Sequence, residues 1–286
     1  MRKQKGQKNR EKCGLSISAL CRAADMSRQN YYKQRTMRKK KAVDESLILA
    51  SVRQERSLQP KLGARKMLDL IGPYLQAAAV SIGRDRFFSL LSANNLLIER
   101  KKRNCRTTNS RHSFDVYRNI RKDCATTGPH QVLVSDITYL RTGQTFVYLA
   151  LVMDAHSRAI VGFDCSDSLE ALGALRALSM AVKQLPTKSM AIHHSDCGTQ
   201  YCCKAYINKL TKSGLRISMT EKNHCYENSQ AERLNGILKQ EYGLGDTFAD
   251  KSEAYDAVRQ AVWLYNHRRP HGKLGNQFPM TVHAAA

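Results

Sequence analysis

The sequence predicts an α/β protein with a mixed five-stranded sheet and flanking helices, preceded by small all-α modules. At residue 131 the pattern changes, and apolar, β-branched runs replace the helical spacing of the earlier part. The 286 residues are enough for one core of about 150 residues together with smaller modules. Charge divides at nearly the same place: residues 1–125 hold 30 basic and 10 acidic side chains, and residues 126–286 hold 17 and 14.

A formal net charge of +23 points to a polyanion as partner, and its position assigns nucleic-acid binding to the front of the chain. No apolar run reaches the ~18–20 residues that span a bilayer, and the first twelve residues lack the apolar segment of a signal peptide. We therefore expect a cytoplasmic protein.

Nine cysteines make an odd number, which argues against a disulfide framework and favours small buried fillers. Structural zinc is not expected, because the closest approach to a ligand set lacks a second pair of ligands. That set is Cys197, Cys202 and Cys203 with His193 and His194.

Residues 15–35 are typical of a helix-turn-helix, with Ser16 and Ser27 as the N-caps of two short helices. In that geometry the second helix enters the major groove and its first residues meet the base edges. Here those residues are Arg28, Gln29 and Asn30. The alternative is a basic helical pair that only packs.

A second helical module follows, with Asp44 as the cap of its first helix, a helix near 64–72, and a third helix from Ser81 to Asn94 or Asn95. Arg84 and Arg86 in the first turn of the third helix could contact phosphates, or could belong to an ordinary wet surface.

A basic strip, residues 99–113, comes next and has little to bury. It either follows a DNA backbone or is merely solvated. The side chains that would make the contacts are Arg100, Lys101, Lys102 and Arg103. The predicted divisions are an N-terminal helix-turn-helix (1–40), a second helical DNA-binding module (41–103), a basic linker (104–125), the α/β core (126–245), and a C-terminal helix and tail packed on that core (246–286).

In the core, three adjacent strands (131–140, 146–155 and 159–166) precede a helix, a short strand, a helix near 203–213 and a fifth strand at 215–220. A helix from about 228 to 242 closes the core. The order β-β-β-α-β-α-β is the arrangement of a ribonuclease-H-like core.

Three acids fall where such a sheet would bring them together: Asp136 within the first strand, Asp196 after the fourth, and Glu232 on the last helix. Carboxylates are hard ligands suited to Mg²⁺, and two ions ~3.5–4 Å apart can activate an attacking hydroxyl and neutralise a leaving oxygen. An Asp inside an apolar strand is costly without a ligand or partner, which favours this reading of Asp136 over a turn-capping role.

Three segments in order, VSDITYL (134–140), HHSDCGTQY (193–201) and ENSQAERLNGILKQE (227–241), resemble the catalytic segments of integrase-type transposases. The match is to the OrfB-type proteins of bacterial insertion sequences in the IS-three family, relatives of retroviral integrases. Between Asp196 and Glu232 lie 35 residues, the spacing of this catalytic class. The resemblance extends to residues 62–67, 82–88, 107–112 and 265–271 and to Pro279. The His-His-Cys-Cys zinc module of the retroviral relatives is absent from the N-terminal part of this sequence.

The resemblance implies an integrase catalytic core whose Asp136, Asp196 and Glu232 bind two Mg²⁺ ions, for which Mn²⁺ can substitute. It implies cleavage at 3′ ends and strand transfer on double-stranded DNA, both the terminal inverted repeats of an insertion sequence and a target, through a circular intermediate. It further implies a homo-oligomer on DNA, an upstream OrfA partner or fusion, and a place at the bacterial nucleoid.

Two neighbours of Glu232 are candidate DNA contacts. Lys239 follows it by seven residues, two helical turns less about 20°, so both share one helix face. Lys239 could reach the phosphate beside the scissile bond, the role of the corresponding residue in the family, or be a plain exposed lysine. Asn228, four residues before Glu232, shares that face and could also brace the carboxylate. Activation by metal needs no histidine base, so packing or positioning is expected for His193, His194 and His224.

The C-terminal segment 252–271 is predicted to be helical and to dock on the core through Val258, Val262 and Tyr265, with Trp263 off that stripe. Its basic end could touch DNA or cap the helix and close the fold. The residues concerned are Arg268, Arg269 and His271.

Two other functions compete with a transposase. A regulatory DNA-binding protein could keep the fold without turnover, although the presence of all three acids argues against it. A plain nuclease of ribonuclease-H type would need neither the basic helix-turn-helix front nor the helix that carries Glu232 and Lys239.

Overall fold

The computed structural model describes residues 16–98, 115–143, 145–187, 189–221 and 227–285. The chain forms two compact units, residues 1–51 and residues 52–286. The helix α2 (Arg28–Leu58) contributes to both, and the sheet and the predicted catalytic residues belong to the second.

In the first unit, α1 (Ile17–Ala23) begins at Ser16, whose hydroxyl accepts the N–H of Ala19. The hydroxyl of Ser27 likewise accepts the N–H of Asn30 at the start of α2, at 3.1 Å. Both predicted caps are therefore confirmed.

The second helix does not stop near residue 35. It continues to Leu58 as a single helix of 31 residues, so the predicted new start at Asp44 is wrong. No glycine or proline interrupts residues 28–58, and lysine, arginine, glutamine, glutamate and alanine are strong helix formers. The predicted division between residues 40 and 41 lies inside this helix, and the five-part division of the chain stays a prediction.

The helix α3 (Ala64–Ala77) extends past the predicted end at residue 72 and contains Pro73. Its buried stripe outweighs the backbone hydrogen bond that proline removes. That stripe consists of Met67, Leu70, Ile71 and Leu75. The helix α4 (Arg84–Ala93) begins after Gly83 instead of Ser81 and ends at Asn94, as expected.

The sheet has the strand order β3-β2-β1-β4-β5. Its strands are β1 (Val132–Thr142), β2 (Thr145–Asp154), β3 (Ile160–Ser166), β4 (Ile192–Ser195) and β5 (Arg216–Met219). The first three are antiparallel neighbours, and β1, β4 and β5 run parallel. The predicted mixed five-stranded sheet is confirmed. A sixth strand, β6 (Thr247–Phe248), pairs in parallel with the end of β1 and is too short to leave a periodic signal.

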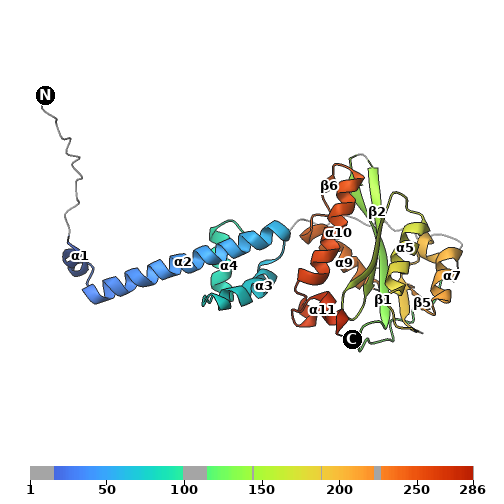
Figure 1. Ribbon diagram of the computed structural model, residues 1–286, viewed down its shortest axis with the longest axis horizontal. Coiled ribbons are helices and arrows are strands. Elements are labelled where there is room, and N and C mark those ends of the chain that lie inside the picture. The colour runs from blue at the N-terminus through green and yellow to red at the C-terminus, as the bar shows by residue number, and fades with distance from the viewer. Residues whose placement is uncertain (1–15, 99–114, 144, 188, 222–226, 286) are drawn as a thin grey trace, which may run out of the picture. The chain divides into compact units, whose positions relative to one another are not determined.

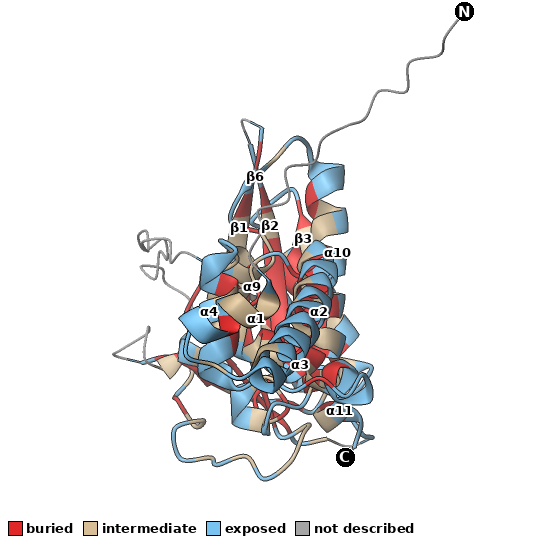
Figure 2. Ribbon diagram, turned by 90° about the vertical axis from the view of Figure 1, so that its left-hand side faces the viewer, coloured by how far each residue is buried: buried red, intermediate tan, exposed pale blue. Residues whose placement is uncertain are grey.

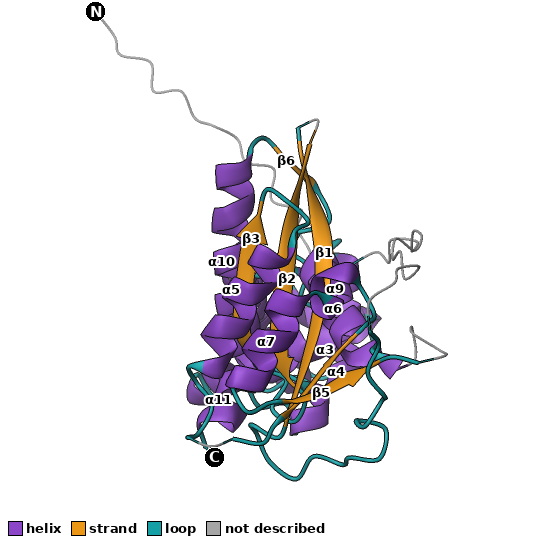
Figure 3. Cartoon of the chain, turned by 90° about the vertical axis from the view of Figure 1, so that its right-hand side faces the viewer, coloured by secondary structure: helices purple, strands orange, loops and turns teal. Residues whose placement is uncertain are grey.

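Helices cover both faces of the sheet (Figure 1; Figure 3), with α9 and α10 on one face and α5 and α7 on the other. Their bounds are α5 (Ala171–Val182), α6 (Thr199–Cys202), α7 (Lys204–Lys212), α9 (Ser229–Glu241), α10 (Lys251–Arg268) and α11 (Pro279–Ala284), with a 3₁₀ turn, η1, at Gly272–Leu274. None of the helices in the described part of the chain is long and apolar enough to cross a bilayer.

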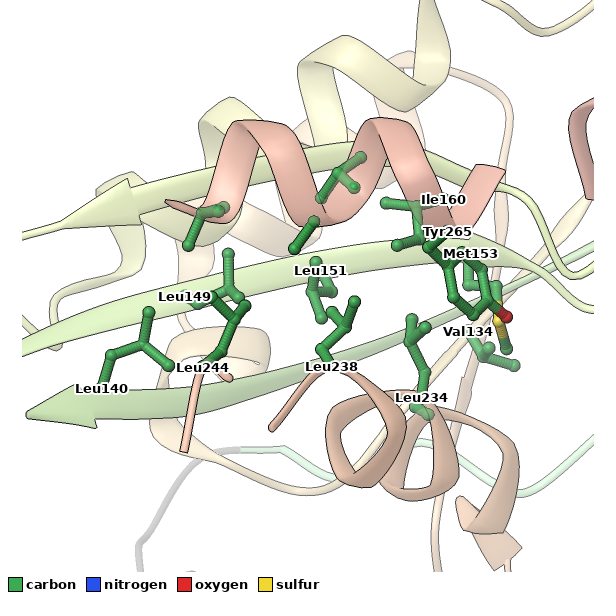
Figure 4. Close-up of a cluster of buried hydrophobic side chains, with 14 of the residues drawn as sticks. Val134, Leu140, Leu149, Leu151, Met153, Ile160, Leu234, Leu238, Leu244 and Tyr265 are labelled. Carbon is green, nitrogen blue, oxygen red and sulfur yellow. The ribbon is translucent and has the colours of Figure 1, made fainter. Parts of the chain in front are cut away.

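Each face of the sheet has its own apolar core, because alternate side chains of a strand point to opposite faces. Figure 4 shows one of them, where Leu151 of β2 faces Leu238 of α9 and Met153 of β2 lies beside Tyr265 of α10. Figure 2 shows β2 and β3 as the buried centre of the core. The predicted stripe of α10, Val258, Val262 and Tyr265, is buried, and Trp263 is 55% exposed, as expected.

Candidate active site

The site lies at a gap in the pairing along one edge of β1. On this edge β4 pairs with residues 132–134 and β6 with residues 141–142. Within the described part of the chain, no strand pairs on this edge with the residues between them, whereas β2 pairs along the other edge. Side chains satisfy the backbone there: Asn228 Nδ2 donates to the Ser135 carbonyl at 3.0 Å, and the N–H of Ile137 donates to Asp136 Oδ1 at 2.9 Å. Asp136 therefore stands in an opening of the sheet edge.

Asp196 is brought to the same opening by the parallel register. Val134 pairs with His194, so Asp136 and Asp196 both lie two residues beyond that pair. The Asp196 Oδ1 atom accepts the N–H of Gly198 at 3.0 Å, where the chain turns into α6. This bond fixes the half-buried carboxylate at the end of β4.

Glu232 is exposed in the first turn of α9. The helix begins at Asn228, whose carbonyl accepts the N–H of Glu232 at 3.2 Å. Since the side chain of Asn228 is tied to Ser135, the start of α9 is held against β1 next to Asp136.

The electrostatics of Asp136 agree with a site at which the three acids lie near one another. Burial, and next the negative charges of Asp196 and Glu232, together raise the pKa of Asp136 to about 7, against hydrogen bonds from Ile137 and Asn235 that lower it. The three carboxylates do not all lie within 4.8 Å of one another. The carboxylate oxygens of the three acids are hard ligands that repel one another, and their spacing leaves room for divalent cations between them. Bound cations would relieve this repulsion, so the residues present fit a metal site.

Asn235 is a site residue that the sequence reasoning missed. Its Nδ2 donates to Asp136 Oδ2 at 2.8 Å, and the side chain is 7% exposed. It follows Glu232 by three residues, and this spacing puts it on the same helix face, a signal that could have identified it.

Lys239 lies at the site, as the helix geometry predicted. Its Nζ is 4.5 Å from the centroid of the Tyr139 ring on β1. Burial lowers the pKa of Lys239, and the charge of Asp136 opposes this shift. Its contact with DNA stays a prediction.

Asn228 differs from its expected role. At 2% exposed it offers almost no surface to DNA, and its hydrogen bond goes to the Ser135 carbonyl and not to the Glu232 carboxylate. We assign it a positioning role at the junction of β1 and α9.

His193 and His194 are fully buried and hydrogen-bonded within the core. His193 Nε2 is 2.8 Å from Ser135 Oγ and 3.0 Å from Tyr206 Oη, and His194 Nδ1 is 2.9 Å from Ser218 Oγ. These contacts agree with the expected packing role. His224 lies outside the described residues.

The other predicted DNA contacts are distributed over the helical front. Arg28, Gln29 and Asn30 are exposed in the first turn of α2, and Arg84 and Arg86 are exposed in the first turn of α4. The predicted contacts of the basic strip, Arg100, Lys101, Lys102 and Arg103, lie outside the described residues.

At the end of α10, the structure supports fold closure, one of the two alternatives. Arg268 pairs with Glu55 of α2 at 2.8 Å, and Arg269 pairs with Glu241 of α9 at 2.7 Å. Arg269 is only 3% exposed, so its guanidinium forms this internal ion pair and offers almost no surface to DNA.

This fold and its convergent carboxylates define a class: a DDE-type polynucleotidyl transferase with an integrase core. Models of the integrase core domain match residues 126–225 and residues 213–279. The chain is 32% identical over 91% of its length to the "insertion element IS600 uncharacterized 31 kDa protein" of Shigella sonnei, of which it covers 96%. It is 30% identical to the transposase InsF for insertion sequence IS3A of Escherichia coli (strain K12), with 93% of each chain covered.

The chain belongs to the IS-three family of transposases. Among solved structures, it is similar to the HTLV-2 integrase catalytic core domain in complex with magnesium, at 17% identity and a TM-score of 0.44, over 56% of this chain and 99% of that one.

Proposed function

We propose that this transposase binds the terminal inverted repeats of an insertion sequence and catalyses Mg²⁺-dependent cleavage of their 3′ ends and strand transfer. The observation that carries the proposal is the placement of Asp136, Asp196 and Glu232 at one opening of the sheet edge, where the parallel register of β1 and β4 and the bond from Asn228 to Ser135 bring them. Three carboxylates placed near one another repel, and such an arrangement is expected at a functional site where the reaction needs their charges.

Asp136, Asp196 and Glu232 would hold two Mg²⁺ ions, and Mn²⁺ could take their place. Bound there, the ions supply activation of the attacking hydroxyl and neutralisation of the leaving oxygen. Asp136 is half-buried on β1 and fixed by Asn235, whereas Glu232 is exposed on α9. We infer that DNA approaches from the side of α9.

Lys239 would contact the phosphate next to the scissile bond. Its ammonium group lies over the Tyr139 ring, which limits the directions open to it, and its partial burial strengthens a contact with an anion. Asn235 would keep Asp136 Oδ2 in place while DNA substrates bind and leave.

The helical front would hold the DNA. Arg28, Gln29 and Asn30 would read base edges from the start of α2, while Arg84, Arg86 and the basic strip Arg100, Lys101, Lys102 and Arg103 would contact phosphates. Since two ends must be processed, we propose that a homo-oligomer assembles on DNA, with an upstream OrfA product as a further partner or fusion.

The test is an assay with Mg²⁺ and labelled DNA that carries the element ends. We expect joined strands with the parent chain and at least a thousandfold less product, roughly, with Asp136→Asn or Glu232→Gln, since the loss of a group that stabilises transition-state charge commonly costs ~10²–10³ or more. Glu170→Gln, which changes an exposed acid before α5, is the matched control and should keep full joining.

Two outcomes would replace the proposal. Cleavage without joining would make the protein a nuclease of ribonuclease-H type. Specific binding of the ends with neither reaction, under both Mg²⁺ and Mn²⁺, would make it a regulatory DNA-binding protein.

A further inference from the structure

A second group of potential metal ligands lies away from the acidic triad. His130 precedes β1, Asp154 ends β2, and His283 is in α11 near the C-terminus. One ligand atom from each lies within 4.8 Å of the other two, and in the described part of the chain no other group of three His, Cys, Asp or Glu residues meets this distance. Asp154 pairs with Leu133, three residues along β1 from Asp136.

The hydrogen bonds of Ser157 fix the tautomer of His283. Ser157 Oγ donates its one proton to Asp154 Oδ1 at 2.9 Å, so it can only accept from His283 Nδ1, which is 3.0 Å away. Nδ1 of His283 therefore carries the proton, and Nε2 carries a lone pair. Nε2 is buried and has no hydrogen-bond partner, in a side chain that is 6% exposed.

Asp154 is fully buried and has room for one more ligand. Its Oδ1 accepts three donors, the N–H groups of His156 and Ser157 and the Ser157 hydroxyl, whereas Oδ2 accepts only the N–H of His130, at 2.7 Å. Among the described residues no lysine or arginine forms an ion pair with it within 4.0 Å. The charge of Arg158 acts on Asp154 from beyond ion-pair distance, and a metal ion bound at the carboxylate would neutralise it directly.

His130 is held beside this carboxylate by its backbone. Its φ is +64°, in the left-handed region that non-glycine residues seldom occupy, and its N–H donates to Asp154. Its ring meets the His283 ring edge-on, with centroids 4.4 Å apart. The half-buried position of His130 leaves a way in for an ion.

We propose that His130, Asp154 and His283 form a site for a transition-metal ion of the zinc class, which ties α11 to the end of the sheet. Two imidazoles and one carboxylate suit zinc, whereas Mg²⁺ prefers oxygen ligands alone. A tetrahedral ion ~2.0–2.1 Å from each ligand holds them about 3.4 Å apart. The ligand atoms lie within 4.8 Å of one another, so binding would bring any two of them closer by at most about 1.4 Å. Ser157 would orient His283 through Nδ1, as such hydrogen bonds do at zinc sites.

The experiment uses the full chain with the catalytic acids removed by Asp136→Asn, Asp196→Asn and Glu232→Gln, so that only other sites can bind metal. After treatment with a chelator, the protein is titrated with Zn²⁺, and with Co²⁺ as the spectroscopic probe. We expect one equivalent bound per chain, tetrahedral Co²⁺ absorption, and no response to Mg²⁺. Zinc a hundredfold above its Kd should raise the Tm by roughly 5–10 °C.

The variants separate this site from others. Ser157→Ala should weaken zinc binding about 10–100-fold, and His283→Gln or His130→Gln by roughly a hundredfold or more. His156→Gln, which changes a neighbouring half-buried histidine, and Cys202→Ser should keep the parent affinity. Circular dichroism of the metal-free variants checks that they fold. If one of the two histidine variants does not fold, the other provides the test.

Unchanged stoichiometry and affinity in both histidine variants would overturn the proposal, as would loss of zinc in Cys202→Ser alone or no zinc uptake by the parent chain. Because the triad is disabled throughout, these outcomes are independent of the strand-joining assay.

Discussion

The carboxamide of Asn235 holds the carboxylate of Asp136 across 99 residues of sequence, with Nδ2 at 2.8 Å from Oδ2. The bond joins the helix that carries Glu232 to the strand that carries Asp136. It leaves Asp136 Oδ1 to the N–H of Ile137, so both oxygens of this acid have a fixed direction before any ion binds.

Replacement of Asn235 by alanine should therefore weaken the metal site without removing a ligand. Loss of a residue that orients a ligand typically costs 10–100-fold in metal affinity or activity. We expect the Mg²⁺ concentration for half-maximal cleavage to rise by about tenfold or more, with little change in DNA binding. Asn208→Ala, at an exposed position of α7, is the control. Equal Mg²⁺ dependence in both variants would contradict the positioning role.

Lys239 is expected to act on DNA and not on the metal. In Lys239→Gln, the salt dependence of DNA binding should fall by about one unit of log-log slope, and joining should decrease more than binding. Lys204→Gln, an exposed lysine of α7, serves as control. Tyr139→Phe keeps the ring under the ammonium group and should retain joining, whereas Tyr139→Leu should lose part of it. An unchanged salt slope in Lys239→Gln would mean that this lysine makes no phosphate contact.

The sequence was informative wherever a local pattern determines the structure. The strand runs around Asp136, the caps Ser16 and Ser27, and the apolar stripe of α10 each depend on neighbours within a few residues. The candidate catalytic acids were predicted from the order and spacing of the segments around them, because single acids carry little information.

Contacts between distant segments could not be predicted in this way. The bond from Asn228 to Ser135 and the grouping of His130 with His283 depend on how the sheet and helices pack. The same holds for the length of α2, where residues predicted as a solvated break continue a helix because nothing in them ends it.

His193 should make stability depend on pH. Burial, and next the neighbouring His194, lower its pKa to about 3, against ~6.5 in an unfolded chain. Between these values the unfolded chain binds a proton that the folded chain does not, so stability is fully present above about pH 6.5 and is lost as the pH falls below it. In urea unfolding between pH 4 and 6, His193→Gln should reduce the slope of stability by up to ~1.4 kcal/mol per pH unit. A slope equal to that of the parent would show that His193 does not contribute.

Glu241 is the centre of an internal charge cluster with Lys66 and Arg269. Burial by itself would raise the pKa of Glu241, but Arg269 and Lys66 outweigh it and lower the pKa. The cluster therefore stabilises the fold above the unfolded pKa of about 4.3, and this stability is lost as the pH falls through the lower folded value. Glu241→Gln leaves the buried Arg269 without its partner and should cost roughly 3 kcal/mol in denaturant unfolding at pH 7. Asp256→Asn, in the exposed pair with Arg259, should cost at most about 1 kcal/mol.

Gly162 of β3 should tolerate no side chain, because α5 crosses it at backbone distance. A Cβ atom there would lie 2.1 Å from the carbonyl oxygen of Ala177 and 3.1 Å from the nitrogen of Ala181. Both atoms are backbone, so no side-chain rotation relieves the clash and α5 itself must move from the sheet. We expect Gly162→Ala to cost roughly 2–3 kcal/mol or more.

The control is Gly72→Ala in α3, where a Cβ meets nothing within 4 Å. Alanine there should stabilise by about 0.5–1 kcal/mol, since glycine costs that much in a helix. Chemical denaturation of both variants measures the two effects of one added methyl group. If Gly162→Ala were as stable as the parent, α5 could not pack on β3 as closely as the structure has it, and Ala177 and Ala181 would not need to be small.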